Sequence, residues 1–124
     1  MIWTLSQVAL GGAIGSMLRH LANIGAARLF GHGFPFGILL INAFGSFLMG
    51  VMVVVLAKFG GTRHAPFLMS GILGGFTTFS AFSLDAATLW ERGQAGLALG
   101  YVAATVCLSL GGIAAGLFLA RQVL

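Results

Sequence analysis

Apolar residues fill most of this chain in long blocks, and polar residues gather in short segments between the blocks. Four blocks approach the roughly 20 residues that a helix needs to cross the hydrocarbon core of a bilayer. They cover residues 2–18, which can extend toward residue 29, then 36–57, 66–90 and 97–119. The pattern therefore predicts an all-α membrane protein with four transmembrane helices in a single domain, residues 1–124.

The links between these blocks are short and hold most of the charged residues. They cover residues 28–33, 58–64 and 91–94. Pro35 and Pro66 stand at the starts of the second and third blocks, where a helix tolerates the missing N–H of proline. Three histidines lie near block ends, where we expect interfacial positions: His20, His32 and His64.

Composition limits the function classes. The chain is 59% hydrophobic and 6% charged, whereas a soluble domain carries about a quarter charged residues. The six Lys and Arg residues are scattered, which argues against nucleic acid as a partner. The sequence has no paired carboxylates, Cys/His cluster, Ser/His/Asp set or phosphate loop with its Lys, so we expect no enzymatic activity.

Small residues recur four apart in three pairs, which predicts close packing of helices within one bundle. The pairs are Gly11 with Gly15, Gly96 with Gly100, and Gly112 with Gly116.

Basic residues divide evenly between the two sides of the predicted membrane domain. One side would hold Lys58, Arg63 and Arg121, and the other Arg19, Arg28 and Arg92. Because positive residues normally gather on the cytoplasmic side, an even split arises either by chance or because the chain inserts both ways up. Two opposed copies could then form an antiparallel dimer, and a four-span chain this small encloses little by itself.

The third block contains a polar interruption, GILGGFTTFSAFS at residues 71–83. Gly74 and Gly75 loosen a helix, and the Thr and Ser residues that follow add hydroxyls at membrane depth. Within lipid, an opened helix must find new partners for its freed carbonyls, so such openings line protein or a cavity. We therefore expect the third helix to break near its middle and to hold something polar there.

Phe79 and Phe82 share a helix face directly after this interruption. Two Phe residues ordinarily serve packing. At a pathway, the positive edge of a ring attracts an anion and its negative face attracts a cation, so the sign of a permeant ion stays open.

Other spans also carry polar groups. Asn42 either makes an interhelical hydrogen bond or lines a pathway. Tyr101, Thr105 and Ser109 fall four apart and form a polar stripe, although Thr and Ser can also bond their own helix.

Two charged residues lie within or beside a span. Arg19 either reaches the headgroups or forms an electropositive vestibule. Asp85 is the one carboxylate within a span, and it is either exposed or paired with Arg92.

Three motifs, in this order and spacing, resemble the Fluc/CrcB fluoride channel family over nearly the whole chain. They are GGAIGSMLR at residues 11–19, Gly37 with Asn42 and GSF at 45–47, and GGFTTFSAFS at 74–83. The resemblance implies a dual-topology homodimer of antiparallel four-helix subunits in a bacterial cytoplasmic membrane. It further implies two pores for passive fluoride export, and a central structural Na⁺.

The resemblance also assigns residues. It implies that the backbone carbonyls of Gly74 and Thr77 hold Na⁺ and that Arg19 belongs to a vestibule. The implied fluoride pathway comprises Asn42, Phe79, Ser80, Phe82, Ser83, Tyr101, Thr105 and Ser109. Two positions depart from the family pattern: Ile38, where a Thr hydroxyl is common, and Phe76, where an aliphatic residue is usual.

Two other functions are alternatives to a fluoride channel. A small multidrug antiporter is also a four-span antiparallel dimer, but it needs an acidic residue in its first span, and this chain has none there. A non-transporting scaffold subunit would instead use the polar stripe to contact another protein.

Overall fold

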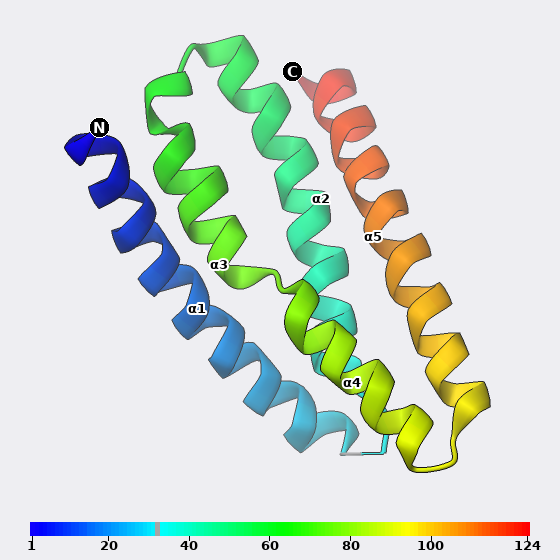
Figure 1. Ribbon diagram of the computed structural model, residues 1–124. Coiled ribbons are helices and arrows are strands. Elements are labelled where there is room, and N and C mark those ends of the chain that lie inside the picture. Colours follow the sequence, from blue (N-terminus) through cyan, green and yellow to red (C-terminus); the bar gives the residue numbers. More distant parts are fainter. Residues whose placement is uncertain (32) are drawn as a thin grey trace.

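The computed structural model describes residues 1–31 and 33–124, so His32 and its predicted interfacial position lie outside the described residues. The described chain is helical throughout, with short links, which confirms the all-α class (Figure 1). Its elements are α1 (Ile2–Phe30), α2 (Phe36–Phe59), η1 (Thr62–His64), the π-helical η2 (Pro66–Leu73), α3 (Gly74–Phe76), α4 (Phe79–Glu91) and α5 (Ala95–Val123).

Helix ends follow local sequence signals. Gly60 takes a left-handed conformation (φ 73°) after α2, where its N–H bonds the Leu56 carbonyl at 3.0 Å. Glycine adopts this conformation without the Cβ clash that other residues suffer. Pro66 begins η2, and the Thr78 hydroxyl caps α4 by accepting from the Ala81 N–H at 3.2 Å.

Three helical stretches are long and apolar enough to cross a membrane: Phe36–Phe59, Thr62–Glu91 and Ala95–Val123. The second of these runs from η1 to the end of α4. These stretches support three of the four predicted spans. The polar residues Gln7, Arg19, Asn23 and Arg28 lower the hydropathy of α1, whose crossing of the membrane stays a prediction.

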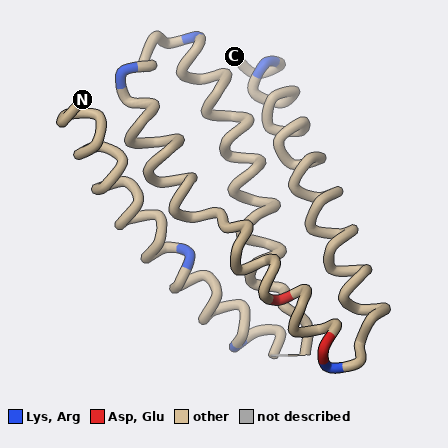
Figure 2. Tube along the Cα trace, in the orientation of Figure 1, with Lys and Arg blue, Asp and Glu red and all other residues tan. Residues whose placement is uncertain are grey.

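Helix α1 continues past Arg19 to Phe30, the longer of the two extents that the sequence allows. Arg19 therefore lies inside a helix rather than at its end, and it is half-buried. Figure 2 shows basic positions at both ends of the bundle and midway along α1.

The helices pack in two pairs. Helix α1 lies along η2 and α3, and α2 lies along α5, while α4 packs mainly on α5 (Figure 1). Both termini and the α2–η2 link lie at one end of the molecule, and the α1–α2 and α4–α5 links lie at the other.

Glycines bring these backbones together. A Cβ on Gly15 would meet the Ile72 carbonyl and, at 2.8 Å, the Phe76 nitrogen, while a Cβ on Gly116 would meet the Phe47 carbonyl. In the same way, a Cβ on Gly11 would meet the Gly71 Cα, and a Cβ on Gly112 would meet the Ala43 carbonyl. Close packing is thus confirmed for two of the three predicted pairs.

The prediction is wrong for the third pair within the described part of the chain. A Cβ on Gly96 or Gly100 would meet nothing within 4 Å. Both glycines are exposed.

Candidate ion pathway

The middle of the η2–α4 stretch contains two extended residues. Helix α3 ends at Phe76, Thr77 (φ −85°, ψ 157°) and Thr78 (φ −154°, ψ 127°) are extended, and α4 begins at Phe79. The side-chain amide of Asn42 bonds this segment: Oδ1 accepts from the Thr78 N–H at 2.8 Å, and Nδ2 donates to the Thr78 carbonyl at 2.9 Å. Asn42 on α2 therefore satisfies both backbone groups of an extended residue.

The same geometry diverts two helix donors. A continuous α-helix would pair the Thr78 N–H with the Gly74 carbonyl and the Ala81 N–H with the Thr77 carbonyl. Here the first N–H goes to Asn42 and the second to the Thr78 hydroxyl. The Gly74 and Thr77 carbonyls, which the resemblance assigns to Na⁺, are therefore the ones that lose these donors. Carbonyl oxygen is a ligand that hard cations accept, so this pair fits a Na⁺ role.

A cavity of about 540 Å³, here called the central cavity, lies beside this segment between α2, α4 and α5. Its walls include Asn42, Ser46, Gly74, Thr77, Thr78, Phe79, Phe82, Thr105 and Ser109. Phe79 is 77% exposed and Phe82 is 7% exposed. Their rings meet edge to face, with centroids 5.4 Å apart at 69°. The fold thus gathers seven of the predicted site residues around one space.

Two hydroxyls at this cavity are unusual. Within the described part of the chain, Thr105 Oγ1 and Ser109 Oγ are buried and have no hydrogen-bond partner. A buried polar group without a partner costs about 1–3 kcal/mol and calls for a functional or structural reason. The two hydroxyls can donate to an anion in the central cavity.

Tyr101 does not line the central cavity with the rest of its predicted stripe. Its ring is fully buried and packs against Phe82 with centroids 5.3 Å apart, and against Phe34 at 5.6 Å. Its hydroxyl donates to Asp85 Oδ2 at 3.3 Å. The partner found for Asp85 is therefore Tyr101, and not the Arg92 considered from the sequence.

The remaining predicted residues lie outside the central cavity. Arg19 and Ser80 line a second space of about 470 Å³ between α1 and α4, here called the side cavity. Ile38, one of the two departures from the family pattern, also lines it. Ser83 is exposed, and its hydroxyl donates to the Phe79 carbonyl of its own helix at 3.0 Å. A vestibule role for Arg19 stays a prediction.

The structure adds residues that sequence reasoning missed. Ser46 lines the central cavity one helical turn after Asn42, and this spacing of four could have identified it. Thr78 is central to the site through its backbone and its capping hydroxyl. No side-chain pattern predicts a backbone role of that kind, because it arises from the conformation of residues 77 and 78.

Residues 6–117 match the model of the family described as CrcB-like protein, Camphor Resistance (CrcB). The chain belongs to the CrcB-like family. This confirms the resemblance drawn from the three motifs.

Similar members of the CrcB-like family carry a functional name. A protein of Cereibacter sphaeroides is 64% identical over 121 residues, which cover 98% of this chain and 97% of that protein. One from Paracoccus denitrificans is 55% identical over 95% of this chain and 94% of its own length. One from Ruegeria sp. is 51% identical over 100% and 99%. Each is named fluoride-specific ion channel FluC.

Proposed function

We propose that this chain forms a fluoride-selective channel through which F⁻ leaves the bacterial cytoplasm passively. The observation that carries the proposal is the central cavity, where the Phe79–Phe82 pair lies with the Thr105 and Ser109 hydroxyls, which have no hydrogen-bond partner among the described residues. The names of the family members above support fluoride as the ion. An ion channel is not an enzyme, in agreement with the lack of a catalytic set in the sequence.

The cavity chemistry suits a small anion. Fluoride holds its water strongly, so a pore must offer donors in place of that water, and hydroxyl and amide groups can do so. Thr105, Ser109 and Ser46 bring hydroxyls, and Asn42 brings an amide whose nitrogen donates one of its two hydrogens to Thr78. Ring edges of Phe79 and Phe82 add weak attraction. Conduction needs sites that are favourable enough to enter and weak enough to leave.

We further propose that two copies assemble antiparallel and complete two pores. One chain leaves the cavity open on the side of Phe79, whose ring is 77% exposed. The charge distribution favours neither orientation strongly, because Lys58, Arg63 and Arg121 lie toward one end, Arg28 and Arg92 toward the other, and Arg19 between them. A second copy across this face would enclose the ring.

In this proposal, Na⁺ binds where the two extended segments meet at the dimer axis. The Gly74 and Thr77 carbonyls of both chains would hold it, because their regular helix donors are diverted. The cation would neutralise the partial charge of these carbonyls and join the subunits. Its role is structural.

Two alternatives predict different behaviour. A multidrug antiporter would couple dye uptake to protons through a carboxylate in α1, and the sequence has none there. A scaffold subunit would conduct nothing without another protein.

The test is passive fluoride release from vesicles that contain this purified chain and no other protein. Release above that of protein-free vesicles supports the channel and excludes the scaffold. Absence of release, or release that requires a proton gradient, contradicts the proposal.

A further inference from the structure

An apolar groove of about 370 Å³, here called the α1–α2 groove, lies between the last turns of α1 and the first turns of α2. Small residues leave this space, because its wall contains Ala22, Gly25 and Ala26 of α1 and Gly37 of α2. A Cβ on Gly37 would come within 3.3 Å of the Ala26 Cβ, whereas a Cβ on Gly25 would meet nothing within 4 Å. The two helices therefore approach closely at Gly37 and Ala26, and the groove stays open at Gly25.

Larger apolar side chains complete the wall of the groove. They are Leu29, Phe30, Leu40, Ile41, Phe44 and Phe76, the last of which comes from α3. Among the described residues, no charged side chain lines this space. From Phe30 back to Ala22 it follows about 12 Å of helix, at 1.5 Å per residue. That length is close to one leaflet of a hydrocarbon core about 30 Å thick. The groove thus runs from the α1–α2 link toward the break beside Phe76, as a lipid acyl chain runs from its headgroup toward the bilayer centre.

The groove and the central cavity lie on opposite sides of α2. Leu40 and Phe44 line the groove, and Asn42 and Ser46 line the central cavity. Two residues along a helix turn it by about 200°, so these two pairs point in nearly opposite directions. Leu40 is 46% exposed and Phe44 is 56% exposed. A second copy across the Phe79 face would therefore leave the groove open to lipid.

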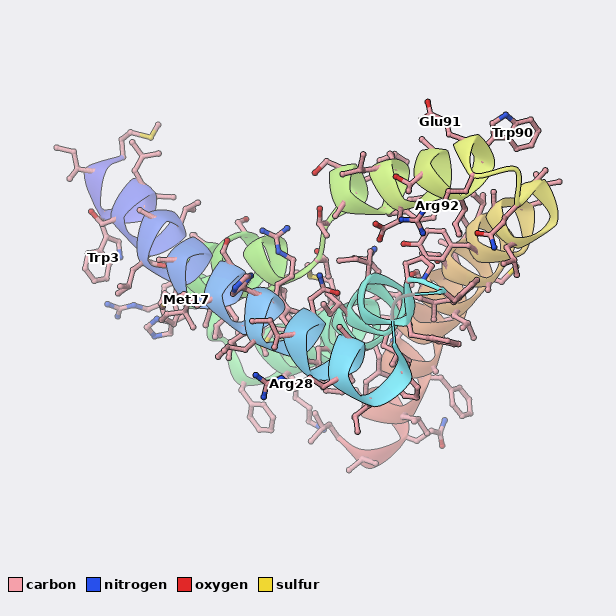
Figure 3. All side chains as sticks on the ribbon, turned by 90° about the horizontal axis from the view of Figure 1, so that it is seen from below. Trp3, Met17, Arg28, Trp90, Glu91 and Arg92 are labelled. Atoms are coloured by element: carbon pink, nitrogen blue, oxygen red, sulfur yellow. The ribbon has the colours of Figure 1, made fainter. Side chains whose placement is uncertain are left out.

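Arg28 brings a positive charge to the rim of the groove. It is exposed, and it follows Gly25 by three residues, which makes the two neighbours on the helix surface. The two carboxylates of the chain, Asp85 and Glu91, both lie in α4. Asp85 is bonded by Tyr101, and Figure 3 shows Arg28 and Glu91 on opposite sides of the molecule. A counter-charge for Arg28 consequently comes from outside the chain.

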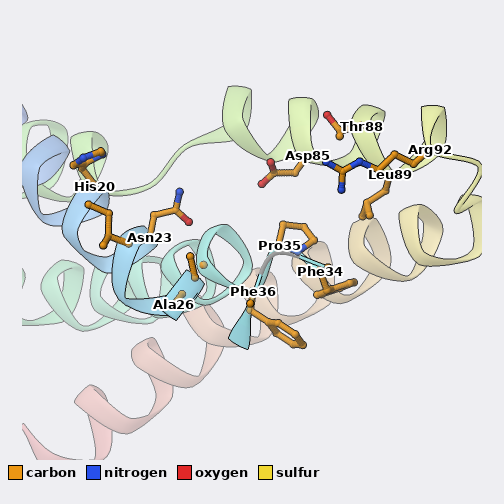
Figure 4. A pocket seen from close by; sticks show the side chains of 15 residues that line it. His20, Asn23, Ala26, Phe34, Pro35, Phe36, Asp85, Thr88, Leu89 and Arg92 are labelled. Atoms are coloured by element: carbon orange, nitrogen blue, oxygen red, sulfur yellow. The ribbon is translucent and has the colours of Figure 1, made fainter. Parts of the chain in front are cut away.

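Another cavity near the same end of the molecule suits a lipid tail less well. It has about 330 Å³, and its wall contains His20, Asp85 and Arg92 (Figure 4). An acyl chain has no group that could pair with a charged side chain, so its insertion there would leave polar groups without partners. The apolar wall of the α1–α2 groove imposes no such cost.

We propose that the α1–α2 groove holds one acyl chain of an anionic phospholipid whose headgroup lies at Arg28. Lipid tails are as apolar as the wall, so transfer of a chain from the bilayer gives little preference by itself. The preference comes from close packing in the groove and from attraction between the headgroup and the basic side chain. Such a lipid would join the last turns of α1 to the first turns of α2. This proposal does not depend on fluoride conduction.

The test counts the lipids bound to the purified chain by native mass spectrometry, after incubation with equal amounts of phosphatidylglycerol and phosphatidylcholine with identical acyl chains. We expect a single lipid per chain at low lipid concentration, mainly phosphatidylglycerol. Gly25→Leu places a side chain in the groove and should remove most of this binding. Gly100→Leu is the matched control, because Gly100 is an exposed glycine of α5 whose Cβ would also meet nothing within 4 Å. Equal lipid binding by Gly25→Leu and the unchanged protein would overturn the proposal.

The charge at the rim is tested separately. Arg28→Gln should lower the preference for phosphatidylglycerol over phosphatidylcholine about fivefold, the effect of one basic residue near anionic lipid. Arg28→Lys keeps the charge and should keep the preference. Arg63→Gln, at an exposed arginine of η1, is the control and should also keep it. An unchanged preference in Arg28→Gln would exclude the anionic headgroup from this site.

Thermal midpoints show whether the variants fold and what fills the groove. A ligand that binds only the folded state raises the midpoint, so phosphatidylglycerol should raise it for the unchanged protein and for Gly100→Leu, but not for Gly25→Leu. If Gly25→Leu loses the dimer while it binds lipid normally, a second copy fills the groove and the lipid proposal is wrong. If Gly25→Leu does not fold, Arg28→Gln and Arg28→Lys decide the proposal, because Arg28 is exposed and its replacement leaves the packing intact.

Discussion

At the scale of single residues, Asn42 unites two roles that the sequence left as alternatives. Its amide is bonded at both ends to Thr78, and the same side chain lines the central cavity. An interhelical hydrogen bond and a position on the pathway are therefore compatible. The sequence identifies the residue by its depth in an apolar block, but it cannot identify the partner.

Replacement of Asn42 by Ala should weaken both fold and flux. Loss of the amide leaves the Thr78 N–H and carbonyl without partners, at about 1–3 kcal/mol for each buried group. We expect a lower thermal midpoint in detergent and reduced fluoride efflux. Asn42→Asp keeps an acceptor for the N–H and should be intermediate in stability. A variant Asn42→Ala that melts and conducts like the unchanged protein would contradict this account.

The hydroxyls of Thr105 and Ser109 should separate stability from conduction. Because neither has a partner among the described residues, Thr105→Val and Ser109→Ala break no internal bond and should keep the melting temperature. Each removes a donor from the pathway, so fluoride efflux should fall about tenfold, as for a hydrogen bond to a charge. Ser70→Ala, at an exposed position on η2, is the control and should conduct normally. Unaltered efflux in both cavity variants would remove these hydroxyls from the pathway.

At the scale of elements, apolar blocks predict the helices well because burial in lipid requires long uninterrupted apolar stretches. Blocks 36–57 and 97–119 fall within α2 and α5. Periodicity could not settle the end of α1, since Arg19 looks like a boundary and lies inside a helix. The π-helical winding of η2 and the extended pair Thr77 and Thr78 likewise depend on packing against α1 and α2.

Glycine contacts between α1 and the η2–α3 segment give an element-scale prediction. In Gly15→Ala the new Cβ would meet backbone atoms of Ile72 and Phe76, which cannot move aside as a side chain can. Overpacking of this kind costs about 1–3 kcal/mol, so the thermal midpoint should fall. In Gly12→Ala the new Cβ would meet nothing within 4 Å. This variant should keep or raise the thermal midpoint, because Ala favours a helix over Gly by about 1 kcal/mol. Equal midpoints for the two variants would show that this contact does not hold the helices together.

At the scale of the whole molecule, motif order identified the family, which the family model and the relatives confirm. Arrangement in space was less predictable. The stripe Tyr101, Thr105 and Ser109 divides because the Tyr101 hydroxyl bonds Asp85 on α4, whereas Thr105 and Ser109 line the central cavity. Residue spacing on one helix carries no information about what a neighbouring helix places opposite it.

Antiparallel assembly predicts two topologies in one membrane. With Cys107 replaced by Ser, a new cysteine in Thr62→Cys lies in the exposed η1 link and can be labelled from outside intact vesicles. We expect a labelled and a protected population of similar size. Labelling of one population alone would mean a single orientation and would exclude the antiparallel dimer.

Fluoride efflux from vesicles loaded with equal fluoride and chloride tests the central claim most directly. The purified chain is reconstituted alone, no proton gradient is applied, and ion-selective electrodes follow both anions. We expect rapid release of fluoride, with chloride release no faster than from protein-free vesicles. Fluoride release at the protein-free rate, or equal release of both anions, would contradict the assignment of this chain as a fluoride-selective channel.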